Sequence, residues 1–311
     1  MRLDALHHIT MITGDAQRNV DLYAGVLGLR LVKKTVNFDA PEAYHLYFGD
    51  ERGAPGSILT WFEFAGAAGG RAGAGMIHTL ELGVASEDSL RFWSERLSAH
   101  GYASEGSGGS LRFADDDGLR LALVRSAADN APLRAEHPEI PAEHAICGVE
   151  GARAYGVFAG VQENFLTDAL GFRYEGEGSY VIAGARRSFR WAYDRPPEAA
   201  GRQGAGTVHH IAWACQDEDQ VAWQTHVSEL GGYVTDVRDR DYFKSIYFRE
   251  PRGILFEIAT LSPGFAVDED SAHLGEKLRL PRMHEHLRPE LERTLKPVVN
   301  PRSAGGPQAV A

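Results

Sequence analysis

The chain has 311 residues, of which 43% are hydrophobic and 24% are charged, and its formal net charge is −11. This composition is typical of a globular protein of about two domains, and the negative charge argues against nucleic acid or an anionic membrane as a partner. Cys147 and Cys215 are the only cysteines, and residues 1–13 lack the basic and apolar segments of a secretory signal, so we expect a cytoplasmic protein. No stretch of about 18 apolar residues predicts a membrane-spanning helix. A small-molecule ligand fits this charge best, and the sequence leaves open whether the chain forms a homo-oligomer.

The first 66 residues predict one strand, one helix and three further strands. The run Leu6 to Ile12 is typical of a buried strand, and a helix is expected over Ala16 to Val26 because Gly28 follows it as a stop signal. The further strands are expected at Arg30 to Phe38, Ala43 to Phe48 and Ser57 to Phe64. An Ala- and Gly-rich linker then covers 66–75.

The same order of elements recurs three times in the rest of the chain. The first strands of these copies begin at Met76, near Ile146 and at Thr207, and the helices are expected at 86–101, 162–170 and 217–230. The later strands are expected at 111–114 and 119–124, at 180–182 and 188–193, and at 233–237, 245–248 and 253–260. We therefore divide the chain into four modules, at 1–66, 75–126, 143–195 and 205–265, followed by a C-terminal extension at 266–311 with a short helix at 287–295 and a disordered tail.

Repeats of this length predict how the modules pair. Each module offers one apolar sheet face that it cannot bury alone, so we expect an α+β fold in which four βαβββ modules pair into two curved sheets or barrels. The stretch Leu6-His7-His8-Ile9-Thr10 in module 1 has a near copy, Val208-His209-His210-Ile211-Ala212, in module 4. If His8 and His210 share one metal, modules 1 and 4 form the metal-bearing unit and modules 2 and 3 form a structural one.

The alternation of side chains along a strand predicts which histidines face the site. His8 shares a face with Thr10 in the first stretch, and His210 lies on the corresponding face of the second. His7 and His209 are therefore expected to point the other way.

A third candidate ligand lies in the last strand of module 4. In the stretch Gly253 to Ala259, Glu257 lies opposite an apolar face. A carboxylate in the middle of an apolar strand is costly unless a cation or a metal pairs with it. An ion pair with Arg240 or Arg249 is the alternative interpretation.

Two histidines and one carboxylate indicate a particular chemistry. His8, His210 and Glu257 would leave adjacent coordination positions open, as in the facial triad of non-haem Fe(II) oxygenases, although the same donors accept Mn, Co or Zn. Alignment of the modules places Thr60 at the position of Glu257, so module 1 offers no carboxylate there. Glu63 is the candidate for a fourth ligand, but its offset from Thr60 puts it on the other face of its strand.

Six motifs spread over most of the chain carry a resemblance to a known family. They are Leu6 to Thr10, Tyr47 to Asp50 with Pro55-Gly56, Thr207 to Ile211, Asp239 to Phe248, Gly253 to Ala259 and Leu274 to Leu278. Together they resemble the vicinal oxygen chelate superfamily, which includes glyoxalase I, bleomycin-resistance proteins and type I extradiol dioxygenases. More narrowly, the chain is similar to ring-cleaving dioxygenases related to hydroquinone 1,2-dioxygenases.

This resemblance implies Fe(II), or less often Mn(II), bound by His8, His210 and Glu257. It also implies an extradiol-type enzyme that opens a hydroquinone-like or catechol-like ring with O₂, so the expected partners are a small aromatic substrate and O₂. The metal would lower the pKa of the phenol and hold both reactants next to each other.

The resemblance further implies roles for Thr10, His209, Arg240 and Tyr247 beside the metal. His209 would handle protons near neutral pH, Arg240 would stabilise negative charge on oxygen, and Tyr247 would hold a substrate or dioxygen atom. His209 can do this only if a bend or bulge in its strand overrides the face count. Taken alone, the charge run around Arg240 is typical of a solvated turn, and Tyr247 is also compatible with a core position.

Two other functions stay open at the level of sequence. A glyoxalase I-type lyase or isomerase would normally need a fourth protein ligand, commonly a second Glu, and Thr60 at that position counts against it. A non-catalytic small-molecule-binding protein would need no metal, and would give the two histidines and Glu257 no reason to converge.

Overall fold

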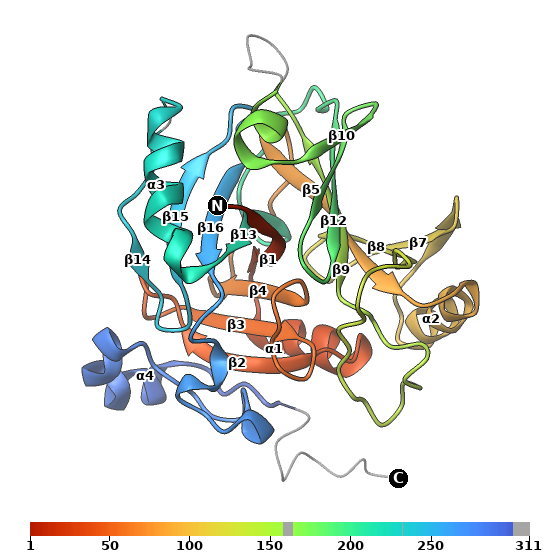
Figure 1. The fold of residues 1–311 in the computed structure, drawn as a ribbon. Helices are drawn as coiled ribbons and strands as arrows, with labels where there is room; N and C mark the ends of the chain where they lie inside the picture. The colour runs from red at the N-terminus through yellow and green to blue at the C-terminus, as the bar shows by residue number, and fades with distance from the viewer. Residues whose placement is uncertain (158–163, 232, 301–311) are drawn as a thin grey trace.

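The computed structural model describes residues 1–157, 164–231 and 233–300, and its strands form two eight-stranded sheets (Figure 1). Sheet 1 has the order β14-β15-β16-β13-β1-β4-β3-β2. Its strands are β1 (Leu3–Thr13), β2 (Arg30–Val36), β3 (Tyr44–Gly49), β4 (Ile58–Glu63), β13 (Thr207–Cys215), β14 (Arg238–Asp239), β15 (Lys244–Arg249) and β16 (Leu255–Thr260). Modules 1 and 4 therefore share one sheet, as predicted, and the strands that carry the two His-His pairs lie side by side at its centre.

Sheet 2 repeats this arrangement with modules 2 and 3, in the order β10-β11-β12-β9-β5-β8-β7-β6. Its strands are β5 (Met76–Val84), β6 (Glu105–Ser107), β7 (Ser110–Ala114), β8 (Arg120–Arg125), β9 (Val149–Tyr155), β10 (Arg173–Gly176), β11 (Ser179–Ala183) and β12 (Ser188–Asp194). The predicted α+β class and the predicted pairing of βαβββ modules are confirmed. The residue boundaries between modules stay a prediction.

Short helices flank the two sheets (Figure 1). They are α1 (Ala16–Val20), α2 (Glu87–Ala99), α3 (Gln220–Glu229) and α4 (Arg288–Thr294), the π-helices η1 (Asp21–Val26) and η2 (Phe165–Ala169), and the 3₁₀ turns η3 (Asp217–Asp219), η4 (Phe265–Val267), η5 (Ser271–His273) and η6 (Arg282–Leu287). The N-cap of α2 is Ser86, whose Oγ accepts a hydrogen bond from the Ser89 N–H at 3.2 Å. Residues 162–163 of the predicted third helix and the predicted tail at 301–311 lie outside the described residues.

The predicted strand at 233–237 is wrong. Tyr233 is 84% exposed, and Val234 makes only an isolated bridge to β15. Thr235 accounts for the irregular backbone, because its side-chain Oγ1 accepts the hydrogen bond of the Tyr247 N–H at 3.1 Å where a regular ladder would use a carbonyl. The edge strand of module 4 is the two-residue β14 instead, and β6 and β10 were likewise not predicted, because these three strands are short, polar and largely exposed.

An aromatic core joins the two sheets. Trp213 of β13 and Phe256 of β16 pack against Trp191 of β12, with ring centroids 6.0 and 5.5 Å from the Trp191 ring, and all three residues are fully buried. Side chains alternate along β16, so Glu257 points away from this core, as predicted. The core thereby fixes one face of β13 and β16 and leaves the opposite face to the candidate site.

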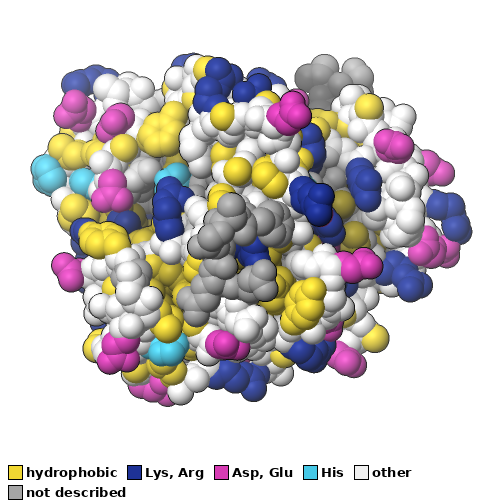
Figure 2. Space-filling model, turned by 90° about the horizontal axis from the view of Figure 1, so that it is seen from above, with side chains coloured by type: hydrophobic (Ala, Val, Ile, Leu, Met, Phe, Trp, Pro, Cys, Tyr) yellow, Lys and Arg dark blue, Asp and Glu magenta, His cyan; other side chains and the backbone are white. Residues whose placement is uncertain are grey.

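No helix within the described ranges is long and apolar enough to cross a membrane. Both cysteines are buried and free. The face of the molecule seen in Figure 2 carries basic and acidic side chains interspersed with apolar ones.

Candidate metal centre

The strand register arranges the candidate site as two matching rows across sheet 1. The residues of the first row, paired on adjacent strands, are Tyr247, Glu257, Ala212 and His8. Those of the second row are Tyr47, Thr60, Thr10 and His210. The rows correspond position by position, so Thr60 stands where the other row has Glu257, and Tyr47 stands where it has Tyr247.

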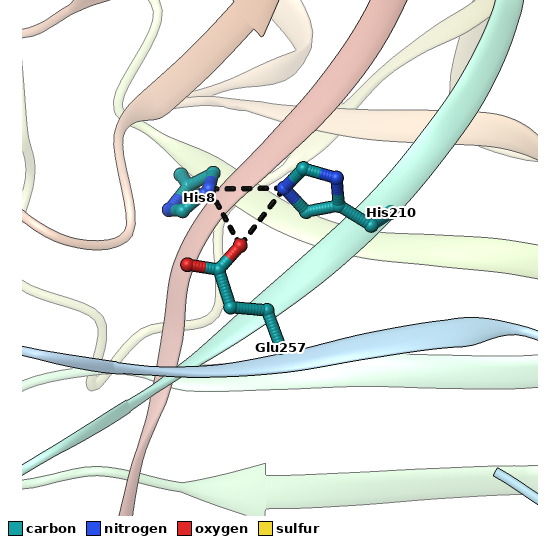
Figure 3. A group of neighbouring side chains, drawn as sticks. All are labelled: His8, His210 and Glu257. Atoms are coloured by element: carbon teal, nitrogen blue, oxygen red, sulfur yellow. Dashed lines mark hydrogen bonds and ion pairs between the residues drawn. The ribbon is translucent and has the colours of Figure 1, made fainter. Parts of the chain in front are cut away.

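His8, His210 and Glu257 come from three neighbouring strands and point at one another (Figure 3). The two Nε2 atoms are 3.4 Å apart, and Glu257 Oε2 lies 3.4 Å from His8 Nε2 and 2.9 Å from His210 Nε2. All three side chains are buried. In the part of the chain that the structure describes, they are the one group of three His, Cys, Asp or Glu side chains placed to share a metal ion.

The carboxylate of Glu257 indicates that a cation belongs at this point. Its Oε1 accepts a hydrogen bond from Ser245 Oγ, whereas no described donor reaches its fully buried Oε2 with hydrogen-bond geometry. Burial raises the pKa of Glu257, but His8 and His210 outweigh that effect and hold its pKa well below the usual range. An ionised, partly unsatisfied carboxylate facing two imidazole nitrogens fits a divalent metal.

The alternative ion pair of Glu257 with an arginine is not formed. Arg240 pairs with Asp39 Oδ2 at 3.2 Å, and Arg249 donates to the Gly253 carbonyl at 2.7 Å. Among the described residues, the carboxylate of Glu257 therefore has only the two histidines within ion-pair distance.

A hydrogen-bonded chain fixes the tautomer of His8. His7 Nε2 lies 3.1 Å from the Thr260 carbonyl, which can only accept, so His7 Nε2 carries the proton. Burial, followed by His8, lowers the pKa of His7 to about 3, so the ring is neutral and its Nδ1 is an acceptor. His8 Nδ1, at 2.9 Å, must then donate to it, so in the neutral ring, the form that binds a metal, the lone pair is on Nε2, which faces Glu257.

Two β-bulges interrupt the alternation of side chains at His7 and His209. Leu6 pairs with Trp213 and His8 with Ala212, so His7 is an extra residue in β1. Thr10 pairs with His210 and Met11 with Val208, so His209 is an extra residue in β13. A bulge re-aims the side chain that it carries, and the expectation that His209 points away from the site is wrong. His7 contacts His8 and the Thr260 carbonyl and is not among the residues that line the cavity beside the site.

The bulge places His209 beside His210 in the wall of the site. The two Nδ1 atoms are 2.8 Å apart, and the His209 ring packs edge-on against Phe62 at 5.5 Å. Partial burial, followed by His210 and Arg249, lowers the pKa of His209 to about 3. The ring is thus a neutral imidazole at physiological pH, and its role in proton transfer stays a prediction.

Two of the candidate ligands, His8 and His210, line a cavity of about 350 Å³ whose walls are mainly aromatic and polar side chains. Its lining residues include His8, Asn37, Phe38, Asp39, His45, Tyr47, Phe62, Phe64, His209, His210, Arg240, Phe243, Tyr247 and Leu255. A cavity of this size, with flat apolar walls and a few convergent polar groups, suits a small aromatic molecule.

Arg240 and Tyr247 both line this cavity, so neither the solvated-turn nor the core alternative describes them. Arg240 Nε donates to Tyr247 Oη at 3.4 Å, and the guanidinium lies between the rings of Phe38 and Tyr247, 5.3 and 5.5 Å from their centroids. Burial lowers the pKa of Arg240, but Tyr247 and Asp39 outweigh it and raise the pKa further above its ordinary value. Arg240 therefore presents a permanent positive charge to the cavity.

Thr10 lies on the second row, where sequence reasoning missed the residues next to it. Its Oγ1 accepts a hydrogen bond from Thr60 Oγ1 at 3.0 Å, Thr60 Oγ1 lies 2.8 Å from His45 Nε2, and His45 Nδ1 lies 2.9 Å from Tyr47 Oη. The alternation of Ala43 to Phe48 could have revealed this pair, because it places His45 and Tyr47 on one face of a buried strand.

Two further carboxylates lie outside the centre. Glu63 Oε1 accepts a hydrogen bond from the Ala16 N–H at 3.4 Å at the start of α1, so it is not a fourth ligand in this structure. Asp194 pairs with His78 at 2.9 Å and with Arg153 at 2.6 Å in sheet 2. His78, which aligns with the candidate ligand histidine of module 1, is thus hydrogen-bonded to a carboxylate that Arg153 also engages.

The structure combines paired βαβββ modules with a buried group of two histidines and one carboxylate, an arrangement suited to holding a metal ion. Comparison with known proteins identifies the family. The model of the glyoxalase/bleomycin resistance protein/dioxygenase superfamily matches residues 5–123 and 163–258, and the chain belongs to this superfamily. The resemblance predicted from the six motifs is confirmed.

Curated relatives cover almost the whole chain. MhqO of Bacillus subtilis (strain 168), provisionally named a ring-cleaving dioxygenase, is 43% identical over 300 residues, 94% of this chain and 96% of the relative. The chlorohydroquinone/hydroquinone 1,2-dioxygenase of Sphingobium indicum is 35% identical over 318 residues, 96% of this chain and 98% of the relative.

Solved structures share the fold. A crystal structure from Bacillus subtilis subsp. subtilis str. 168, provisionally titled a dioxygenase, matches 97% of this chain and 99% of its own with a TM-score of 0.88 and 41% identity. Glyoxalase I from Zea mays matches 87% of this chain and 95% of its own with a TM-score of 0.59 at 15% identity, which shows a common fold alone.

Proposed function

We propose that this protein is an Fe(II)-dependent, extradiol-type dioxygenase that opens a hydroquinone-like or catechol-like ring with O₂. The observation that carries the proposal is the unsatisfied, buried Glu257 Oε2 beside two imidazole nitrogens at the edge of an aromatic-lined cavity. The names of the relatives, among them a hydroquinone 1,2-dioxygenase, support the substrate class. We take Fe(II) as the metal and Mn(II) as its alternative, because oxygen donors and imidazoles accept both.

In this proposal His8, His210 and Glu257 hold the metal, which supplies Lewis acidity toward a phenol oxygen and electron transfer to O₂ when bound. His209, beside His210 in the wall of the cavity, acts as the acid–base group toward the substrate. Arg240 stabilises negative charge on oxygen, and Tyr247, which accepts a hydrogen bond from Arg240, orients the same oxygen.

Two remaining features complete the proposed site. The side chains of Phe38, Phe62 and Phe243 form apolar walls that position a flat ring and exclude water. Thr10 pairs in register with His210 and supports the ligand strand from the side of module 1.

The cytoplasmic setting expected from the cysteine content belongs to the same proposal.

The alternative of a glyoxalase I-type lyase or isomerase is weaker. It would need a fourth protein ligand, and Thr60, at the position that corresponds to Glu257, has its hydroxyl between His45 and Thr10. A non-catalytic binding protein would need no metal, so no cation would offset the cost of burying the charge of Glu257.

The direct test is anaerobic reconstitution with Fe(II), followed by O₂ uptake with a panel of hydroquinones and catechols. We expect uptake with stoichiometric formation of a ring-opened product. Protein shown to carry iron that consumes no O₂ with any of these phenols would contradict the proposal, and the His210→Ala variant serves as the control that lacks a ligand.

A further inference from the structure

The half of the cavity that faces module 1 carries polar groups that the proposed metal chemistry does not use. His45 and Tyr47 of β3 are buried, 6% and 1% exposed, and both line the cavity. Tyr47 pairs with Thr60, which stands where the other row has the carboxylate, and His45 lies two residues before Tyr47 on the same strand, so β3 and β4 contribute no candidate metal ligand. Buried polar groups that line a cavity and bind no metal are placed to hydrogen-bond a molecule that occupies the cavity.

The direction of the hydrogen bonds along this row can be determined from its far end. Thr60 Oγ1 donates to Thr10 Oγ1, so the proton of Thr60 is committed. His45 Nε2, 2.8 Å from Thr60 Oγ1, must then be the donor of that contact. Burial lowers the pKa of His45 well below its ordinary value, so the ring is neutral and its Nδ1 carries no proton.

It follows that the hydroxyl of Tyr47 donates its single proton to His45 Nδ1 at 2.9 Å. No described residue donates to Tyr47 Oη in return, so its lone pairs are left as acceptors. The cavity is also lined by Arg240, a side chain that can only donate. The cavity therefore offers an acceptor, Tyr47 Oη, and a separate donor, Arg240.

From this polarity we infer that Tyr47, held by His45, is the specificity-determining acceptor for a second, protonated hydroxyl group of the substrate ring. The inference rests on the proposed function and narrows its substrate class. The ring carries one oxygen that becomes anionic at the metal and Arg240 side, and one O–H that donates to Tyr47. Substituents that only accept, such as a methoxy group, are disfavoured because they would bring two acceptors together.

The test compares the binding of two phenols in the absence of O₂, so that no turnover occurs. Full-length protein is loaded anaerobically with Fe(II) and titrated with 1,4-dihydroxybenzene and with 4-methoxyphenol by calorimetry. We expect the wild-type protein to bind the dihydroxy compound about tenfold more tightly. Tyr47→Phe should lose about tenfold in affinity for the dihydroxy compound and leave the affinity for 4-methoxyphenol unchanged.

Tyr44→Phe is the matched control, because Tyr44 lies on the same strand but donates its hydroxyl proton to the Lys296 carbonyl, away from the cavity. It should leave both affinities unchanged. The binding of 4-methoxyphenol and the iron content report whether Tyr47→Phe is folded.

Three results would overturn the inference. Equal affinity of the wild-type protein for the two phenols would reject the acceptor site while leaving ring cleavage itself in place. An equal loss for both phenols in Tyr47→Phe would mean that Tyr47 acts on the metal-bound oxygen. Failure of iron-loaded wild-type protein to bind either phenol would reject both this inference and the proposed function.

Discussion

Two adjacent histidines on β13 should have separable tasks. His210 points its Nε2 at Glu257 and His8, whereas His209 contacts His210 through Nδ1 and faces the cavity. We expect His210→Ala to lose iron during gel filtration after anaerobic reconstitution. His209→Ala should retain iron and lose about 100-fold or more in turnover, the usual contribution of acid–base catalysis.

Metal analysis and O₂ uptake on the same samples check both expectations. Iron retained by His210→Ala and lost from His209→Ala would mean that His209 is the metal ligand and His210 the acid–base group. His226→Ala is a control, because its Nε2 contacts the Ala169 carbonyl at 3.0 Å, remote from the cavity, and it should change neither quantity.

Titration of the buried Asp115 should make the stability of the fold depend on pH. Burial raises the pKa of Asp115 from 3.8 to about 6, although Leu119 N–H and Tyr23 Oη hydrogen-bond to its carboxylate. Because the folded state binds this proton more tightly than the unfolded state, the group stabilises the fold below about pH 4 and loses that contribution as pH rises through about 6. The shift corresponds to about 3 kcal/mol.

Asp115→Asn removes this titration while keeping an oxygen for the backbone N–H groups. The free energy of unfolding of the wild-type protein relative to the variant should therefore fall by about 3 kcal/mol between pH 3.5 and pH 7. Urea unfolding at several pH values measures the difference. A difference that does not change with pH would show that Asp115 titrates normally in the folded protein.

Residues that form the candidate centre differ in how far the sequence could predict them. His8, His210 and Glu257 could be selected because a duplicated apolar stretch and a carboxylate in an apolar strand are both visible without a structure. The positions of His7 and His209 could not, because a bulge depends on the register between β1 and β13 and not on the residues of one strand.

A buried lysine of module 1 forms ion pairs with two carboxylates of the C-terminal extension. Lys33 of β2 is fully buried, and its Nζ lies 2.6 Å from Asp268 Oδ1 and 2.5 Å from Glu269 Oε2. Without Lys33, the buried Glu269 keeps the more distant Arg279 at 3.6 Å, so we take the lower end of the cost of breaking a buried ion pair, about 3 kcal/mol. We expect this loss of unfolding free energy in Lys33→Met, measured by urea denaturation.

Lys34→Met is the matched control on the same strand. Lys34 is only partly buried and donates to the Val298 carbonyl at 3.4 Å, so its loss should cost less than about 1 kcal/mol. Equal losses in the two variants would mean that hydrophobic contacts, and not the ion pairs of Lys33, hold the extension on β2.

The elements that differ from the prediction do so for two physical reasons. Strands β6 and β14 are short and exposed, so they carry no apolar alternation to detect. The helix predicted from Ala16 to Val26 continues as the π-helix η1, and a π-helical hydrogen-bond pattern has no signature in the period of the apolar residues.

At the scale of the whole molecule, the pairing of modules was predicted from the assumption that His8 and His210 share a site. The order of sheet 1 agrees, with β1 and β13 antiparallel at its centre. Composition and repeat length alone would have allowed other pairings, because every module offers a similar apolar sheet face. Function and topology are therefore linked, since the site exists only when the first and last modules meet.

That link predicts that a metal bound at the candidate site would stabilise the entire fold. The donors come from β1 near the N-terminus and from β13 and β16 of module 4, so unfolding of either module destroys the site. A ligand that binds only the folded state at about 100 times its dissociation constant stabilises it by about 2.7 kcal/mol. We expect this gain when Mn(II), which avoids oxidation during the measurement, is added to chelator-stripped protein before urea unfolding. Glu257→Gln keeps the shape of the side chain but removes its charge, and it should show almost no gain. The same gain in this variant would place the bound metal elsewhere in the molecule.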